Sequence, residues 1–357
     1  MDTGSTTGGP SSSTTGASTP PEPTTGVADS GGTTDDGHAS SSSSSPPSSS
    51  GSSSSTGSDT EAEISCDNQI LDGNETDIDC GGNTCDRCDE GSACTQDIDC
   101  QSALCNGSDS LCAGPPTLLW LDGGDPSQMF TDNACTIAVA ADDDPVRCWR
   151  SRGQLAAEFV SSRGEGRYEI DGGVQLDDDL LVASGVFGAN VAEVAVFVVA
   201  TEVAGTNSFD FNLNHPNTNN IGRYSCHLPW NTSRRIVWDA GNTEAARVRT
   251  TPDLVDVGQT HIFGFVNSAA QGTREIWLDG SSAASGPGHS DAPASNVSLG
   301  DRANLHVFDF RVVQPAPNDA QREIIEGDLA CRWDLRSLLD PAHPYYAADD
   351  TDDTGCP

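Results

Sequence analysis

Apolar and polar residues are distributed unevenly, and the C-terminal two thirds of the chain carry short apolar runs separated by Gly, Asp, Asn and Pro. Residues 192–201 and 260–266 are almost continuously apolar and predict buried strands, whereas residues 305–313 alternate as a half-buried strand does. Residues 275–278 lead into Asp279-Gly280, a pair that favours a tight hairpin turn. Many short strands of this kind predict an all-β sandwich.

One segment near the C-terminus has the pattern of a helix instead. Asn318 can cap a helix through its side chain, and the residues after it place four apolar side chains on one face: Ile324, Ile325, Leu329 and Trp333. Residues 318–334 are therefore predicted to form a single helix.

The first 62 residues consist almost entirely of Ser, Thr, Gly, Pro, Asp and Ala. Burial cannot offset the entropy that such a segment would lose on ordering, so residues 1–62 are predicted to be a disordered linker. A flexible chain of this length has a root-mean-square reach of about 40–45 Å, enough to hold a folded domain away from a cell envelope.

Cysteines are concentrated just after this linker, in a segment (residues 63–114) too poor in aliphatic residues to build a core. Cys85-x-x-Cys88 raises the question of a zinc site, but the density of cysteine favours four disulfides, at about 2–4 kcal/mol each. The spacing does not reveal the pairing. The eight cysteines are Cys66, Cys80, Cys85, Cys88, Cys94, Cys100, Cys105 and Cys112.

The other five of the 13 cysteines lie in the predicted sandwich (residues 116–346) and in an acidic tail (residues 347–357). Pairing of Cys135 with Cys148 would close a short acidic loop, and pairing of Cys331 with Cys356 would hold the tail to the helix. Cys226 is then left over. The alternative, in which Cys226 pairs with one of the other four, stays open.

The net charge is −37, the sequence pI is about 4.1, and all 17 basic residues are arginine. A chain with this balance has no basic patch for nucleic acid or for an anionic membrane surface. The charge favours solubility. Sequence does not fix the oligomeric state.

The cysteine content indicates an oxidising compartment, and we expect an extracellular or outer-surface location. The opening residues MDTGSTTGGPSSS lack the basic and apolar regions of a signal peptide, and no apolar stretch is long enough to span a membrane. We therefore expect an export signal upstream of Met1, for example a lipoprotein signal that would supply a lipid anchor.

Catalytic motifs are weak. Glu169-Ile170-Asp171 is the nearest approach to the paired acids of a glycosidase, and the third acid of that pattern is missing. There is no Gly-x-Ser-x-Gly motif, and the seven histidines show no zinc-binding spacing. The sequence predicts no enzyme activity.

Calcium is the only candidate cofactor. Three groups of carboxylates could contribute oxygen ligands, although a solvated loop is the simpler interpretation of each because Ca²⁺ needs ligands from several loops. They are Asp142 to Asp144, Asp177 to Asp179, and Asp349 and Asp350 with Asp352 and Asp353.

Ligand binding is predicted around Trp230, where an aromatic residue lies between Pro229 and Asn231. An indole face can stack on a sugar ring while neighbouring polar groups form hydrogen bonds. The polar candidates are Asn231, Asp239 and Asn242. The other tryptophans are predicted to lie in the core: Trp120, Trp149, Trp238, Trp277 and Trp333.

The cysteine-rich segment resembles a module of secreted proteins of myxobacteria and related bacteria. The resemblance rests on DGNETDIDCGG (residues 72–82), followed by Cys85-x-x-Cys88, Gly91-x-x-Cys94 and Asp99-Cys100. It implies a small extracellular module and no defined activity.

Residues 120–345 resemble the concanavalin A-like lectin/glucanase superfamily, in its LamG-like branch, through LLWLD (118–122), HLPW (227–230), VWDAG (237–241) and the closing REIIEGDLACRWDL (322–335). The resemblance implies an antiparallel jelly-roll sandwich on which the last helix packs. Asp328, Arg332 and Asp334 depart from the family's usual residues, and we expect them to weaken the helix's anchoring.

These observations favour a secreted or surface-anchored, non-catalytic binding or adhesion protein that recognises a glycan or a surface partner. The alternatives are a structural spacer of the envelope without a ligand and a divergent polysaccharide-active enzyme. An aromatic-lined groove with two nearby carboxylates would favour the enzyme.

Overall fold

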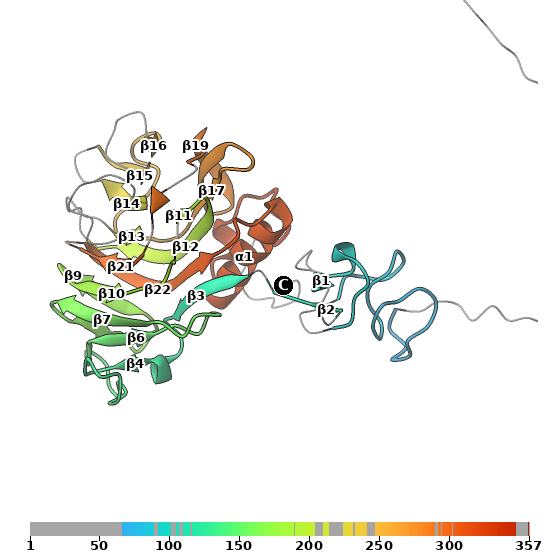
Figure 1. Cartoon of the computed structure of the whole chain (residues 1–357), viewed down its shortest axis with the longest axis horizontal. Coiled ribbons are helices and arrows are strands. Elements are labelled where there is room, and N and C mark those ends of the chain that lie inside the picture. The colour runs from blue at the N-terminus through green and yellow to red at the C-terminus, as the bar shows by residue number, and fades with distance from the viewer. Residues whose placement is uncertain are drawn as a thin grey trace, which may run out of the picture. The chain divides into compact units, whose positions relative to one another are not determined.

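Two antiparallel β-sheets packed face to face confirm the predicted sandwich (Figure 1). The computed structural model describes residues 66–88, 92–100, 105–106, 110–114, 116–188, 190–203, 210–213, 224–230, 233–240, 247–289, 292–293, 295–301, 303–347 and 356. The predicted linker lies outside the described residues.

The first sheet has nine strands among the described residues. In spatial order they are β16 (Arg247–Arg249), β15 (Arg235–Ala240), β14 (Tyr224–Trp230), β13 (Phe211–Leu213), β21 (Val297–Gly300), β10 (Leu180–Ala183), β7 (Glu158–Arg163), β6 (Cys148–Arg150) and β4 (Met129–Phe130).

The second sheet also has nine strands in the described part of the chain. Eight follow one another as β19 (Ser281–Pro287), β18 (Thr273–Leu278), β17 (Thr260–Ser268), β12 (Glu193–Glu202), β22 (Asn304–Val313), β9 (Val174–Asp177), β8 (Gly166–Tyr168) and β5 (Pro145–Val146). The ninth, β3 (Thr117–Asp122), pairs with the second half of β22. A separate short pair joins β11 (Asn190–Val191) to β20 (Ala292–Pro293).

The central strand β12 explains why its sequence is apolar without alternation. Val194, Val196 and Val198 point between the sheets into the main core. Phe197 and Val199 point the other way, into a second apolar layer under the helix. A strand buried on both faces has no position left for a polar side chain.

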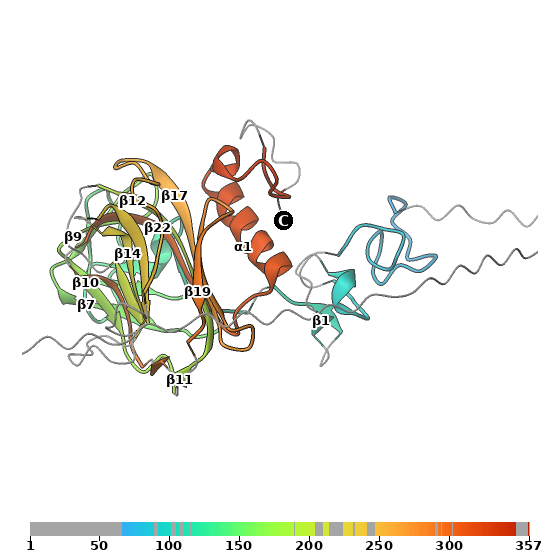
Figure 2. The ribbon, with the colours of Figure 1, turned by 90° about the horizontal axis from the view of Figure 1, so that it is seen from above.

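The helix α1 (Asp319–Arg332) covers the outer face of the second sheet (Figure 2). Asn318 accepts a hydrogen bond from the backbone N–H of Gln321, and the Gln321 side chain accepts one from the N–H of Asn318, which completes a capping box. Ile325 and Leu329 lie in the apolar layer. The predicted helix and its cap are confirmed. Short 3₁₀ turns lie at η1 (Asp97–Asp99), η2 (Pro126–Gln128) and η4 (Arg336–Leu338).

Two of the three residues expected to weaken the helix's anchoring form ion pairs. Asp328 lies 2.6 Å from Arg311 of β22, and Arg332 lies 2.7 Å from Asp122 at the end of β3. Asp334 adopts the left-handed backbone conformation (φ 53°) that glycine favours. Two ion pairs therefore join the helix segment to β22 and β3.

The prediction that five tryptophans lie in the core holds only for Trp149 and Trp238, which are fully buried. Trp277 and Trp333 are half-buried and pack against the layer under α1. Trp120 was wrongly expected in the core. It lies on the outer side of β3, where the guanidinium groups of three arginines approach its ring to within about 5 Å: Arg152, Arg311 and Arg332.

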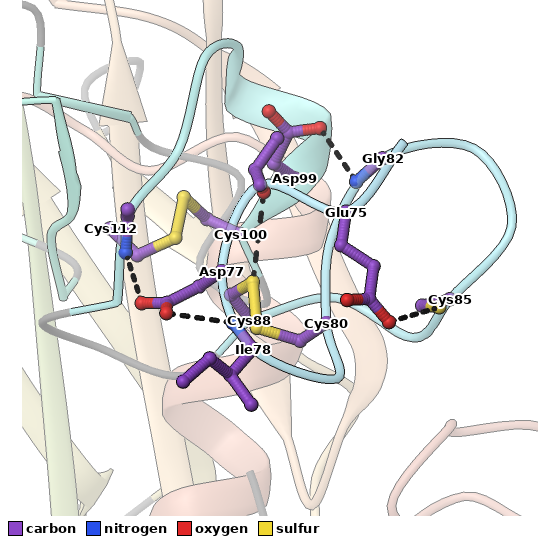
Figure 3. Close-up of a disulfide and its surroundings, with 12 residues drawn as sticks. Glu75, Asp77, Ile78, Cys80, Gly82, Cys85, Cys88, Asp99, Cys100 and Cys112 are labelled. Atoms are coloured by element: carbon purple, nitrogen blue, oxygen red, sulfur yellow. Dashed lines mark hydrogen bonds between the residues drawn. A yellow bond between two sulfur atoms is a disulfide. The ribbon is translucent and has the colours of Figure 1, made fainter. Parts of the chain in front are cut away.

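In the described part of the cysteine-rich segment, β1 (Cys105–Asn106) pairs with β2 (Leu111–Cys112), and the buried cluster consists of cysteines. Asp99 accepts hydrogen bonds from the backbone of Thr95, Gln96 and Gly82, so this acid organises loops (Figure 3). Four disulfides join Cys66 to Cys85, Cys80 to Cys88, Cys94 to Cys105, and Cys100 to Cys112.

Two further disulfides join Cys135 to Cys148 and Cys331 to Cys356, while Cys226 carries a buried free thiol. Six disulfides are compatible with an extracellular protein. In the described part of the chain, α1 and the shorter turns fall short of the length and apolar character needed to cross a membrane.

Candidate functional site

The outer faces of the two sheets differ in what they present. The helix covers the second sheet, whereas the outer face of the first sheet carries polar side chains along β13 to β16 and β21, and we refer to this part as the polar face. Figure 2 shows α1 beside β17, β19 and β22, with β14, β10 and β7 on the far side of the sandwich. Most polar side chains of this face are themselves buried, as Ser225 and Ser298 are, at 0% exposed each.

Strict alternation builds the polar face. On β15, Ile236, Trp238 and Ala240 point into the core, so the residues between them point outward. On β14, Tyr224 and Cys226 are likewise core residues. The outward residues of the two strands are Ser225, His227, Arg235, Val237 and Asp239.

A buried ionic group lies at the centre of this face. Asp239 and His227 are each 1% exposed, and their side chains approach to 3.9 Å. Arg247 of β16 lies directly opposite Asp239 in the ladder, and its Nε is 2.9 Å from the Asp239 carboxylate. Arginine thus compensates a carboxylate that would be costly to bury alone.

Trp230 occupies the end of β14 and is half-buried. Its ring centroid is 4.2 Å from that of His227, and the Arg247 guanidinium is 5.9 Å from its ring. The register of β14 against β15 shifts between His227 and Trp230, so Trp230 faces Arg235 across the strands. An indole held in this way keeps part of its apolar face exposed.

A cavity of about 220 Å³ lies beside this indole, at the edge of the sheet. The register places Val237 opposite Arg249, so both point to the same side as Arg247. The described residues that line the cavity are one aromatic residue, one hydroxyl, one aliphatic residue and three arginines: Trp230, Ser233, Val237, Arg235, Arg247 and Arg249.

The turn between β14 and β15 is fixed from outside the sheet. The backbone N–H of Arg234 donates to the Trp230 carbonyl at 2.7 Å. The Arg234 side chain donates to the Asp253 carboxylate at 3.1 Å and to the Val255 carbonyl at 3.2 Å. Its third neighbour is Glu202 at the end of β12, with 3.9 Å between Nη1 and Oε2. These contacts hold Trp230 beside the cavity.

Glu202 makes the stability of this turn depend on pH. Burial raises the pKa of Glu202 to about 7, against the opposing effect of Arg234. Because the folded-state pKa lies above the unfolded value, the contribution of Glu202 to stability is complete below about pH 4.5 and is lost as pH rises through 7. The free energy of unfolding of the wild type is therefore expected to fall between about pH 5 and about pH 8. We expect this fall to be smaller by about 1–2 kcal/mol in Glu202→Gln.

Urea unfolding at the two pH values measures this difference directly. Glu158→Gln is the matched control, since Glu158 is exposed and pairs with Arg150 on the surface. An identical pH dependence in Glu202→Gln and the wild type would show that Glu202 titrates normally.

The structure brings together two of the four predicted ligand-binding residues, Trp230 and Asp239, through His227 and Arg247. Asn231 and Asn242 lie outside the described residues. Arg235, Arg247 and Arg249 were not predicted, although the alternation of Arg247-Val248-Arg249 could have indicated an exposed strand edge.

The predicted calcium groups use their oxygens within the protein. Asp144 accepts from the backbone of Ala140 and Ala141, and Asp179 accepts from that of Asp177 and Glu165. In the described residues, the groups of three metal-type ligands that lie close together consist of disulfide cysteines, joined in one case by Glu75. The group at 349–353 lies outside the described residues.

No known family model matches the chain, and no curated protein sequence matches it. Similar solved structures include the sialidase of Trypanosoma rangeli, with a TM-score of 0.37 and 11% identity over 62% of this chain and 35% of the sialidase. An α-L-arabinofuranosidase has a TM-score of 0.42 and 8% sequence identity, and the match covers 59% of this chain and 62% of the arabinofuranosidase. Galectin LEC-6 of Caenorhabditis elegans has a TM-score of 0.27 and 13% sequence identity, and the match covers 36% of this chain and 87% of the galectin. The site itself must therefore carry any functional argument.

Proposed function

We propose that this chain is an extracellular, non-catalytic glycan-binding protein whose binding site is the cavity beside Trp230. The observation that carries the proposal is the half-exposed indole at the edge of a cavity with polar and cationic walls. A sugar ring has an apolar face that an indole can cover and hydroxyl groups that guanidinium and hydroxyl donors can bind.

The composition of the cavity supports binding without catalysis. A glycosidase places two carboxyl groups roughly 5–10 Å apart on either side of the scissile bond. Among the described residues, the six that line the cavity include no carboxylate, and the neighbouring Asp239 is held by Arg247. The predicted acids Glu169 and Asp171 lie at a turn, where the Glu169 carbonyl accepts from the Gly172 N–H.

Six disulfides support the extracellular part of the proposal. Such bonds persist in oxidising compartments and are rare in reducing ones. An exported protein that binds without altering its ligand would serve adhesion or retention at a surface.

Trp230→Ala is expected to weaken glycan binding by at least about tenfold, because truncation of a tryptophan at a binding site commonly costs 2 kcal/mol or more. A glycan array identifies ligands of the wild type, and titration calorimetry then compares the variants. Trp277→Ala is the matched control, since Trp277 is half-buried on the second sheet and does not line the cavity.

The proposal fails if the wild type binds no glycan on the array, which would favour the structural spacer. It also fails if Trp230→Ala binds as tightly as the wild type while both variants keep the wild-type melting temperature.

A further inference from the structure

We infer that the cysteine-rich segment consists of two copies of one small unit, and that it binds a basic protein through Ile78 and Ile98, the exposed residues of two equivalent loops. The residues Asp-Ile-Asp-Cys at 77–80 recur at 97–100, one copy in each half of the segment. This surface is independent of the glycan binding proposed for the cavity beside Trp230.

The disulfides have the same pattern in the two halves, residues 66–88 and 94–112. Each half contains four cysteines, of which the first pairs with the third and the second with the fourth. The second cysteine, Cys80 or Cys100, ends the repeated sequence, and in both halves four residues separate it from the third. Two successive stretches with the same pairing indicate one structural unit that occurs twice.

The acid before the second cysteine has the same role in both halves. Asp79 and Asp99 each accept hydrogen bonds, at 2.7–3.0 Å, from two successive backbone N–H groups that follow the first cysteine of their half. The donors are Asn68 and Gln69 in the first half, and Thr95 and Gln96 in the second. Each acid is therefore turned toward the backbone of its own half.

The isoleucine before this acid is exposed in both halves, by 54% at Ile78 and by 57% at Ile98. A single exposed aliphatic side chain is common on a protein surface and indicates nothing by itself. Here the same residue is exposed at equivalent positions of two loops. Among the described residues of the segment, the other large aliphatic side chains are exposed as well: Ile70, Leu71 and Leu111. Because disulfides stabilise the segment, these side chains are available for a partner.

Contacts between the two halves hold the loops in a fixed arrangement. The Ala93 N–H donates to the Asp77 carboxylate at 2.7 Å, next to Ile78. The Cys88 N–H donates to the Asp99 carbonyl at 2.7 Å, next to Ile98. Contact residues that are held in place before the partner arrives lose less conformational entropy on binding.

The charge of the segment selects among the possible partners. Residues 63–114 contain 12 acidic residues and one basic residue, Arg87. This charge would repel a second copy of the segment and a lipid surface with anionic headgroups. A protein surface that combines aliphatic pockets with lysine or arginine side chains complements both the isoleucines and the acidic charge. Charge complementarity therefore favours a basic protein.

Fluorescence anisotropy of a labelled amphipathic peptide of leucine and lysine, titrated with the full chain, tests the inference. Ile78→Ser with Ile98→Ser is expected to weaken binding at least about tenfold, because burial of an isoleucine contributes roughly 1.5–3 kcal/mol. Ile137→Ser with Ile170→Ser is the matched control, since these isoleucines of the sandwich are 60% and 66% exposed, and it is expected to bind as the wild type does. Oligolysine, which carries charge alone, is expected to bind all three proteins equally.

Preserved amide chemical-shift dispersion of residues 66–114 shows that the variant segment is folded. Equal affinity of the Ile78→Ser, Ile98→Ser variant and the wild type for the leucine–lysine peptide would overturn the inference, as would an equal loss in the control. Sedimentation that reveals a wild-type dimer dissociated by this variant would overturn it in favour of a second copy. Binding to phosphatidylcholine vesicles that requires the two isoleucines would overturn it in favour of a lipid surface.

Discussion

Arg311→Met is expected to lower the free energy of unfolding of the sandwich by about 3–5 kcal/mol. Asp309 is completely buried on β22, and Arg311 donates to it through Nε at 3.0 Å and through Nη2 at 3.3 Å. Burial raises the pKa of Asp309 despite this partner. Removal of Arg311 leaves a buried carboxylate with Arg332 at 3.8 Å and the like charge of Asp122 nearby. Urea unfolding followed by tryptophan fluorescence measures the loss.

The double variant Asp309→Asn with Arg311→Met is expected to recover most of this loss, because the buried side chain at 309 is then neutral and the other partner of Arg311, Asp328, is partly exposed. Arg150→Met is the matched control. Arg150 pairs with Glu158 at 3.0 Å on the surface, where an ion pair contributes about 1 kcal/mol or less. A loss no larger than that of the control would mean that Asp309 does not depend on Arg311.

Removal of the Cys100–Cys112 disulfide, as Cys100→Ala with Cys112→Ala, is expected to unfold the cysteine-rich segment and leave the sandwich folded. The buried cluster of this segment consists of Cys88, Cys94, Cys100 and Cys112, so no apolar core remains to replace the bond. A disulfide closing a loop of this length contributes about 3 kcal/mol. Collapse of the amide chemical-shift dispersion of residues 66–114 would report the unfolding.

Tryptophan fluorescence separates the two parts, since all six tryptophans lie between residues 120 and 333. The fluorescence melting temperature is expected to remain unchanged. As a control, Cys135→Ala with Cys148→Ala removes a disulfide of the sandwich, whose large core should keep it folded at reduced stability. Persisting dispersion of residues 66–114 would show that three disulfides suffice.

The strands and the helix could be predicted because their signals are local. The apolar run of β12, the Asp279-Gly280 turn and the Asn318 cap each depend on neighbouring residues alone. The turn has positive φ at both residues, as a two-residue hairpin connection requires. The almost continuously apolar composition of β12 predicts burial on both of its faces without information on the neighbouring strands.

The site was less predictable because it depends on pairing between strands. Trp230 was found from its flanking residues, but the role of Asp239 as the partner of Arg247 requires the register of β15 with β16. The three arginines of the cavity come from two strands separated by a connecting segment. The register of two strands, which sets the residues that lie opposite one another, cannot be derived from their sequences alone.

The ion pairs of the helix were missed for a similar reason. Asp328 was expected to weaken the helix's anchoring, yet it pairs with Arg311 on β22. An acidic residue of a helix can pair with a cation on a strand far away in the sequence, and only the folded arrangement reveals the pair.

The free thiol of Cys226 gives the protein a chemical reporter of its own opening. Cys226 lies on the core-facing side of β14 with no exposed surface, and burial raises the pKa of its thiol well above the usual value. In the closed sandwich neither an oxidant nor an alkylating reagent can reach the sulfur. The rate at which a maleimide labels the native protein therefore records how often β14, the strand that also carries Trp230, separates from the core.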